Sequence, residues 1–374
     1  MSKLKLMTIV GTRPEIIKLS EIIKKADKYF DHVLVHTGQN YDYELNEVFF
    51  QELNIKKPDY FLNVVSGNLG QTLGNVIAKS YDLISVIKPD AVLVLGDTNS
   101  CLSVLSAKRL KVPVFHLEAG NRCFDENLPE EINRRIVDHI SDVNLCYSEH
   151  ARNYLNFEGV NRERTYVVGS PMAEILTKSK VQIESSDILI KLGLIEKKYI
   201  LLSAHREENI DNESNFMSLM TSINELAERY GIPVIYSLHP RSKKIIENRN
   251  FVFHKNVIKS SPFGFFDYNK LQKYAYCVIS DSGTIAEEAS FFKFPAVSIR
   301  TSTERPEAID KGNFVIGGIN GKSIMQAIDL AVSLNENNEF GSDVPDYSDI
   351  NQSLKVLKII QSYVEIVNIK VWNK

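Results

Sequence analysis

Acidic side chains stand directly after short apolar runs in the first half of the chain. Asp97 and Glu118 each follow such a run through one intervening turn or residue, and Glu130 and Glu131 open a helical pattern. Carboxylates that lie close together push each other's pKa values apart, so that one can act as an acid and another as a base. The set therefore predicts proton transfer, with Asp97, Glu118 and Glu130 as the candidate groups.

Cations and small polar residues occupy comparable positions and suit a phosphorylated ligand. Arg13 follows the first apolar run, and Lys18 lies one turn into the helix that begins there. Backbone N–H groups at a helix start bind phosphate, and a guanidinium suits the same anion. A second such turn offers backbone amides, hydroxyls and a carboxylate able to accept hydrogen bonds from a ribose diol, at Ser282, Gly283, Thr284 and Glu288.

Histidines follow two apolar runs of the second half. His205 and His239 both stand at the ends of strand patterns, and we expect both to face the ligand. His116 precedes Glu118 by two residues, and its spacing fits a structural and a functional role equally. No Ser/His/Asp or Cys/His spacing indicates covalent catalysis.

The sequence lacks the motifs of several other classes of binding site. The first strand is followed by Gly-Thr-Arg-Pro-Glu rather than GxGxxG, which argues against a dinucleotide cofactor. The segment 317–323 resembles a P-loop, but Ile316 stands where the first glycine belongs, so a helix start is expected there. The four cysteines have no CxxC spacing and no metal-ligand cluster, which predicts buried thiols and no metal; Cys123 alone falls in a candidate site loop.

Composition limits the partners. The chain has 374 residues, 44% hydrophobic and 24% charged, with a net charge of −3, which argues against nucleic acid and anionic membrane surfaces. The longest apolar runs have the length of strands, and the chain begins with one, without a signal-peptide pattern. A cytoplasmic protein is expected.

The elements that must position these residues alternate between strand and helix. The first half predicts strands at 4–10, 32–36, 91–95, 112–117, 142–147 and 165–168. It predicts helices at 14–28, 42–53, 68–87, 99–110 and 129–141. The alternation restarts near residue 198, with strands at 199–203, 233–238, 256–259, 276–280 and 295–299.

This alternation predicts an α/β fold with two Rossmann-like, doubly wound domains and a central cleft. The domains are expected at 1–169 plus 350–374, and at 170–349, because the last helix of about 350–367 returns to the first half. Ligands of such sheets bind at the carboxyl ends of the strands, where the candidate residues stand.

The order and spacing of these segments resemble the non-hydrolysing UDP-N-acetylglucosamine 2-epimerase family over nearly the whole chain. The resemblance implies the glycosyltransferase-B fold, a homodimer and no redox cofactor or metal. It implies elimination of UDP across C1–C2, a bound 2-acetamidoglycal, and re-addition with the C2 proton on the opposite face. It assigns acid–base roles to Asp97, Glu118 and Glu130 and places His205 at the phosphates. It assigns UDP-sugar binding to Arg13, Lys18, Ser282, Gly283, Thr284 and Glu288. His239 is added to this binding set because of its position at a strand end.

Three segments depart from the usual family pattern. Thr284 replaces the second glycine of the diphosphate turn. The segment 38–45 replaces a stretch that helps bind allosteric UDP-N-acetylglucosamine, which argues against allosteric activation. Together with the loop 120–125, it resembles the subgroup that epimerises UDP-2-acetamido-2,6-dideoxy-β-L-talose to UDP-N-acetyl-L-fucosamine for capsules and O-antigens. We expect this reaction, with formation of UDP-N-acetylmannosamine from UDP-N-acetylglucosamine as the alternative.

Three rival functions share the same residues. A retaining glycosyltransferase of this architecture would need an acceptor site, and a hydrolysing epimerase would release free sugar. A nucleotide-sugar sensor needs no catalysis, but three carboxylates beside a phosphate loop exceed what binding requires. The products formed from a UDP-sugar alone would separate these functions.

Overall fold

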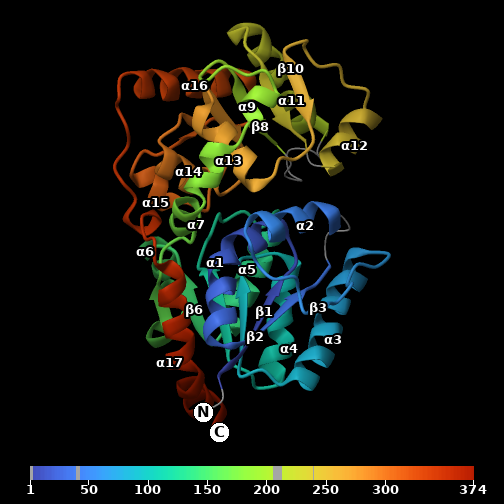
Figure 1. Ribbon diagram of the computed structural model, residues 1–374, viewed down its shortest axis with the longest axis vertical. Coiled ribbons are helices and arrows are strands. Elements are labelled where there is room, and N and C mark those ends of the chain that lie inside the picture. The colour runs from blue at the N-terminus through green and yellow to red at the C-terminus, as the bar shows by residue number, and fades with distance from the viewer. Residues whose placement is uncertain (1–2, 39–42, 205–212, 239) are drawn as a thin grey trace. The chain divides into compact units, whose positions relative to one another are not determined.

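Strands and helices alternate along the chain because short β-branched runs are followed by longer amphipathic stretches. The computed structural model describes residues 3–38, 43–204, 213–238 and 240–374. The chain divides into two compact units, Met1–Lys178 with Pro345–Lys374, and Ser179–Val344 (Figure 1). Each unit is built around its own parallel sheet.

The sheet of the first unit has seven parallel strands in the order β3-β2-β1-β4-β5-β6-β7. The order reverses direction between β1 and β4, which is the switch point where doubly wound sheets bind ligands. The strands are β1 (Lys5–Val10), β2 (Asp31–His36), β3 (Tyr60–Phe61), β4 (Ala91–Leu95), β5 (Val114–Ala119), β6 (Val143–Cys146) and β7 (Thr165–Val167).

Helices pack against this sheet through alternate strand residues. Met7 and Ile9 of β1 and Val92 and Val94 of β4 share one buried cluster with Val104 and other helix residues. Side chains two residues apart point to the same face of a strand, which is why these positions meet. The helices are α1 (Arg13–Tyr29), α2 (Tyr43–Glu52), α3 (Leu69–Ile87), η1 (Asn99–Ser103), α4 (Val104–Arg109), α5 (Pro129–Ile140), α6 (Glu149–Phe157), η2 (Arg162–Arg164), α7 (Met172–Lys178), η3 (Pro345–Tyr347) and α17 (Gln352–Trp372).

The last helix is fastened to the first unit by a buried carboxylate. Glu174 of α7 accepts hydrogen bonds from Lys25 of α1 at 2.7 Å and from the backbone N–H and hydroxyl of Ser353 in α17 at 2.9 and 2.7 Å. These contacts keep α7 with the first unit. The division therefore falls after Lys178 rather than after residue 169, and before Pro345 rather than before residue 350.

The second unit repeats the same order of strands. Its six parallel strands run β10-β9-β8-β11-β12-β13, so the order reverses between β8 and β11. The strands are β8 (Ile200–Ser203), β9 (Val234–Ser237), β10 (Val257–Ser260), β11 (Cys277–Ser280), β12 (Ala296–Ser298) and β13 (Val315–Ile316). The helices are α8 (Lys180–Ser185), α9 (Ile188–Lys191), α11 (Glu213–Tyr230), α12 (Pro240–Asn248), α13 (Phe265–Tyr274), α14 (Ile285–Phe292), α15 (Pro306–Asp310) and α16 (Gly321–Glu336).

The structure confirms the α/β class and both parallel sheets. One predicted helix is wrong in part, because 99–110 begins as the 3₁₀ turn η1 before α4. The helix start predicted in 317–323 is confirmed, since α16 begins at Gly321 and the Asn320 side chain accepts from the Ser323 N–H at 2.9 Å. All four cysteines are buried and free, as expected for structural thiols. Among the described residues, no helix is both long and apolar enough to cross a membrane.

Candidate active site

The loop after β1 is tied to the loop after β4 by one buried acid. Glu15 accepts hydrogen bonds from the Gly11 N–H at 3.0 Å and the Thr12 hydroxyl at 2.8 Å, and a short one from the Ser100 hydroxyl. Burial raises the pKa of Glu15 above its ordinary value, although these hydrogen bonds oppose the rise. Arg13 is the first residue of α1, and its guanidinium lies 5.6 Å from the ring centre of Phe49 in α2.

The backbone at the end of β5 turns sharply at Glu118. Its φ of +68° is left-handed, which is costly for a residue with a Cβ atom. The pairing of β5 with β6 shifts register between Leu117 and Ala119, so Glu118 is left out of the ladder. Irregularities of this kind re-aim a side chain at the rim of a sheet. Glu118 thus leaves the strand pattern at the position where a catalytic group is predicted.

Lys18 and Glu118 form a buried ion pair. The ammonium donates to both carboxylate oxygens, at 2.9 and 2.8 Å, and both side chains are less than a tenth exposed. The Asn121 amide donates to the same carboxylate at 3.3 Å, and the Tyr147 hydroxyl lies 3.5 Å from it. The sequence predicts Lys18 as a substrate-binding residue, whereas its ammonium here compensates the charge of Glu118.

The β4 and β5 loops meet at Gly96. A Cβ atom added to Gly96 would lie 3.5 Å from a carboxylate oxygen of Glu118, and the φ of Gly96 is +77°. Asp97 follows directly, so the two predicted carboxylates come from neighbouring strand ends. The structure therefore brings Lys18, Asp97 and Glu118 to one edge of the first sheet.

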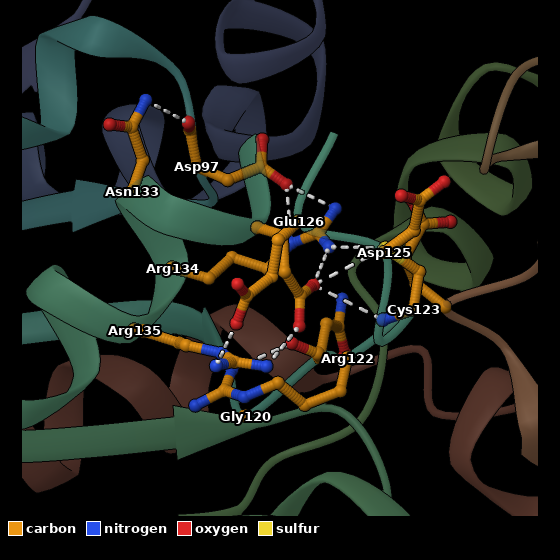
Figure 2. A network of polar contacts seen from close by, with 12 residues as sticks. Asp97, Gly120, Arg122, Cys123, Asp125, Glu126, Asn133, Arg134 and Arg135 are labelled. Carbon is orange, nitrogen blue, oxygen red and sulfur yellow. Dashed lines mark hydrogen bonds and ion pairs between the residues drawn. The ribbon is translucent and has the colours of Figure 1, made fainter. Parts of the chain in front are cut away.

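Arg134 of α5 holds the Asp97 carboxylate in a wider network (Figure 2). Its Nε and Nη2 atoms lie 2.8 and 2.7 Å from Asp97 Oδ2, while Nη1 donates to Glu131 at 2.8 Å. Glu131 also accepts from the Cys123 N–H at 3.2 Å and the Cys123 thiol at 3.3 Å. Burial alone would raise the pKa of Glu131, but these hydrogen bonds and the charge of Arg134 lower it. The loop 120–125 is therefore tied to the start of α5.

Glu130 lies beside this network without joining it. It is half-buried in the first turn of α5, after Pro129 at the first helical position. Within the described part of the chain, the Glu130 carboxylate makes no hydrogen bond or ion pair with another side chain. Its charge suits the positive end of the helix dipole, and its neighbour Glu131 takes the contacts to Arg134.

The second unit places its predicted residues at the end of β11. The hydroxyls of Ser282 and Thr284 lie 3.0 Å apart, and the Ser282 N–H donates to the Ser280 hydroxyl at 3.0 Å. Gly283 stands between them, close to the buried pair formed by Glu304 and Arg300. The N–H groups of Ser282 and Thr284 are used within the turn, which places two hydroxyls directly before α14, where the diphosphate site is predicted.

Two acids stand behind this turn in α14. Glu287 accepts from Arg305 Nε at 3.1 Å, and Glu288 accepts from the Gln272 amide at 2.5 Å. Both are buried. The Gln272 amide is thus one partner that holds the Glu288 carboxylate.

Some predicted residues fall outside the described chain, namely His205, His239 and residues 39–42 of the segment 38–45. Four further residues of this edge were not predicted from sequence: Glu15, Arg134, Tyr147, and Asp138 of α5, whose carboxylate lies 2.8 Å from His116 Nδ1. Glu15 and Arg134 lie in the segments 11–15 and 129–134, which predicted other site residues, so their positions in sequence could have indicated a role in the site. Tyr147 and Asp138 had no such indication.

Comparison with known proteins places this arrangement in a family. The family model described as UDP-N-acetylglucosamine 2-epimerase matches residues 23–361. The chain belongs to this family. The prediction that it is an enzyme of the UDP-N-acetylhexosamine 2-epimerase class is confirmed at that level.

Relatives of this epimerase family match along most of their length. The structure of UDP-N-acetylglucosamine 2-epimerase from Rickettsia bellii is 47% identical, with a TM-score of 0.92 and all of both chains covered. That of Methanocaldococcus jannaschii UDP-GlcNAc 2-epimerase, in complex with UDP-GlcNAc and UDP, is 33% identical, with a TM-score of 0.90, covering 96% of this chain and 100% of that one. A Pseudomonas aeruginosa UDP-2,3-diacetamido-2,3-dideoxy-D-glucuronate 2-epimerase is 35% identical over 84% of this chain and 88% of its own length.

A glycosyltransferase from Rickettsia africae shares the fold of these epimerases but little of their sequence. Its structure aligns with a TM-score of 0.54 at 12% identity, covering 98% of each chain, which shows the fold alone. Together with the epimerase structures, this likeness confirms the predicted glycosyltransferase-B type of fold.

Proposed function

We propose that the protein is a C2-epimerase of a UDP-linked 2-acetamido sugar that works by elimination and re-addition of UDP. The observation that carries the proposal is the pair of carboxylates at neighbouring strand ends, each with its own cation. Glu118 is paired with Lys18, and Asp97 is paired with Arg134. Fixed carboxylates of this kind suit acid–base catalysis.

The proposed reaction is balanced without a redox partner. One carboxylate takes the C2 proton, the C1–O bond to UDP breaks, and its electron pair leaves on the UDP oxygen while a C1=C2 double bond forms. UDP then adds back to C1 as a second acid delivers a proton to the opposite face of C2. Asp97, Glu118 and Glu130 are the proposed proton-transfer groups, with His205 beside the phosphates.

Binding of the nucleotide is proposed for the remaining predicted residues. The hydroxyls of Ser282 and Thr284 and the N–H of Gly283 would donate hydrogen bonds to the diphosphate, and Glu288 would accept from the ribose. Arg13 would supply a cation to the phosphates, and His239 belongs to the same proposed set. A homodimer in the cytoplasm completes the proposal, and light scattering of the purified protein tests the dimer.

The substrate best supported is UDP-N-acetylglucosamine, with UDP-N-acetylmannosamine as product. The names of the relatives favour this sugar over the 6-deoxy-L-talose derivative expected from the sequence. The second candidate remains the formation of UDP-N-acetyl-L-fucosamine. One observation keeps it, since the loop 120–125 that resembles the fucosamine-forming subgroup is firmly tied to Glu131 and lies at the same edge as Glu118.

The test is turnover of each UDP-sugar in D₂O without an acceptor, followed by NMR of the products. Epimerised UDP-sugar with deuterium at C2 supports the proposal, whereas retention of substrate hydrogen overturns the proton-transfer mechanism. Free sugar would indicate a hydrolase, and an unchanged substrate would indicate a transferase or a sensor. The ratio of kcat/KM for the two sugars decides between the candidates. Activity on one sugar alone does not decide, because a pocket built for a methyl group rejects an extra hydroxyl by only about 100-fold.

A further inference from the structure

A fully buried carboxylate, Asp138 of α5, lies behind the strand ends that carry Asp97 and Glu118. Arg122 Nη1 donates to Asp138 Oδ2 at 2.7 Å, and His116 Nδ1 lies 2.8 Å from Oδ1. The Gly120 N–H donates to the two oxygens at 3.2 and 3.3 Å. Asp138 thus gathers three groups from the end of β5 and the loop that follows it.

His116 extends this contact to the β4 loop. Its Nε2 atom lies 2.7 Å from the Gly96 carbonyl oxygen, which only accepts hydrogen bonds. The cluster therefore joins the β4 loop to Asp138 through His116, and Arg122 extends it to Glu158, to which it donates at 2.8 and 2.6 Å.

The charge of Asp138 is well supported. Burial alone would raise its pKa, but the hydrogen bond and charge of His116 and the charge of Arg122 outweigh burial and lower it. An ionised carboxylate in this position accepts the hydrogen bonds that Arg122 and the Gly120 N–H donate to it, and it lies within hydrogen-bond distance of His116 Nδ1.

The contacts of Asp138 lie next to two of the three proposed proton-transfer groups, Glu118 and Asp97. His116 and Gly120 flank Glu118, whose left-handed φ of +68° must be maintained by its surroundings. Gly96, whose carbonyl is held by His116, directly precedes Asp97. Loss of the cluster would release both loops, whereas Asp138 itself is inaccessible to a substrate.

We propose that Asp138 is a positioning residue that fixes Asp97 and Glu118 relative to each other through His116 and Gly120. The proposal rests on the proposed epimerase function, because it gives these two carboxylates successive proton transfers. Elimination needs one correctly placed proton-transfer group, and re-addition needs a second. If the second group is misplaced, the 2-acetamidoglycal formed by elimination is not converted to product.

The test compares Asp138→Asn with the wild-type enzyme. An amide of the same shape cannot accept from all three donors, so both loops shift. A displacement of about 1 Å at reacting groups can lower the rate about 100-fold. We expect kcat to fall by about that factor, with KM and the Kd for UDP unchanged, and we expect 2-acetamidoglycal to appear in solution. A purely structural role would not release the glycal.

Asp142→Asn is the matched control. Asp142 is also buried, but it accepts from the Val114 N–H at 3.0 Å at the amino-terminal ends of β5 and β6, opposite the proposed site. It is expected to lower thermal stability without a change in kcat per folded enzyme and without glycal release.

Two further variants separate the halves of the cluster if Asp138→Asn fails to fold. His116→Asn keeps a donor near the position of Nδ1 for Asp138 and loses the contact with Gly96. His116→Gln keeps a donor near Nε2 for Gly96 and loses the contact with Asp138. Both are expected to lower kcat and release glycal, because the proposal requires the two contacts together.

Four results bear on the proposal in distinct ways. Normal kcat in Asp138→Asn, or in both His116 variants, overturns it. A loss of kcat with an equal loss of UDP affinity and no glycal also overturns it, because that pattern describes a collapsed site. Glycal release by Asp142→Asn also overturns the proposal, because it would show that glycal release is not specific to the contacts of Asp138. Failure of the wild-type enzyme to epimerise any UDP-sugar would instead defeat the underlying function.

Discussion

The carboxyl edges of the two sheets have the same strand order and different chemistry. In the first unit, carboxylates at the strand ends are paired directly with cations, as in Lys18 with Glu118 and Arg134 with Asp97. In the second, the turn itself carries hydroxyls and amides, and its acids Glu287 and Glu288 stand behind it. Strand order alone therefore does not decide what an edge does.

The backbone conformation also differs between the carboxyl edges of the two sheets. At the first edge, Glu118 and the glycines Gly96 and Gly120 have φ between +68° and +80°, which is a strained conformation for Glu118 alone. At the second edge, Thr284 has an ordinary helical conformation, and Gly283 has a negative or extended φ. Strain persists only where the surroundings enforce it, which is typical of catalytic sites. The comparison supports the proposal that the first edge carries the chemistry and the second binds the anion.

The largest effect is expected from Glu118→Gln. The change removes the proposed acid–base group and the partner of Lys18 while it keeps the shape of the side chain. A general acid or base contributes about 100- to 10,000-fold, so kcat should fall by that range while UDP affinity by calorimetry stays unchanged. A loss of UDP binding with normal kcat would reverse the roles of the two edges.

Arg134→Lys should have the next largest effect. The guanidinium bridges Asp97 and Glu131 with separate N–H groups, which one ammonium cannot reproduce. We expect kcat to fall about 100-fold through misplacement of Asp97, with KM for the UDP-sugar unchanged.

Arg135→Lys provides the control for that variant. Arg135 is the next residue, is 41% exposed, and pairs mainly with the exposed Glu126. Its replacement should leave kcat close to that of the wild-type enzyme. Equal losses in both variants would show that helix α5 as a whole, rather than the hold on Asp97, was disturbed.

A smaller effect, on binding rather than on rate, is expected from Glu288→Gln. A hydrogen bond to a charged group is worth about 1.5–3 kcal/mol, so the Kd for UDP should rise roughly 10- to 100-fold by calorimetry. Glu287→Gln is the control, because Glu287 is paired with Arg305 and its loss should lower thermal stability instead. Unchanged UDP affinity in Glu288→Gln would remove the binding role from this edge.

Sequence predicted the strand ends better than the contacts between them. Asp97, Glu118 and Ser282 stand where parallel strands end, and the period of the apolar runs is enough to place them there. The bulge at Glu118 and the hold of Arg134 on Asp97 depend on packing between segments distant in sequence, which no local pattern encodes. Lys18 illustrates the limit, since its position was evident but its partner lies 100 residues away.

The short elements were missed for a related reason. β3 and β13 are two residues long and too short to show a period, so only the neighbouring strands define them. The boundary of the first unit depended on Glu174, whose partners Lys25 and Ser353 come from the two ends of the chain. Such contacts become visible only in the folded molecule.

The smallest effect on kcat is expected from Glu174→Gln. This variant tests whether a buried lysine–carboxylate pair matters for catalysis when it does not lie at a strand end. Like Glu118, Glu174 is buried and has lysine partners, but it joins α1, α7 and α17. Burial alone would raise its pKa, but hydrogen bonds from Lys178, Lys25 and Ser353 lower it from 4.5 to about 2.

This shift fixes the direction of the pH dependence. Because the folded pKa lies below the unfolded value, the stabilisation by Glu174 is fully present above about pH 4.5 and is lost as the pH falls toward about 2. At neutral pH, Glu174→Gln should lower the free energy of unfolding by about 1.5–3 kcal/mol, and kcat per folded enzyme should not change. Urea unfolding of both proteins at several pH values measures the difference, which should shrink in acid because the wild-type carboxylate then becomes neutral as well. A difference that stays constant with pH would mean that the Glu174 charge does not stabilise the fold, and a loss of kcat would mean that a buried lysine–carboxylate pair matters for catalysis wherever it lies in the first unit.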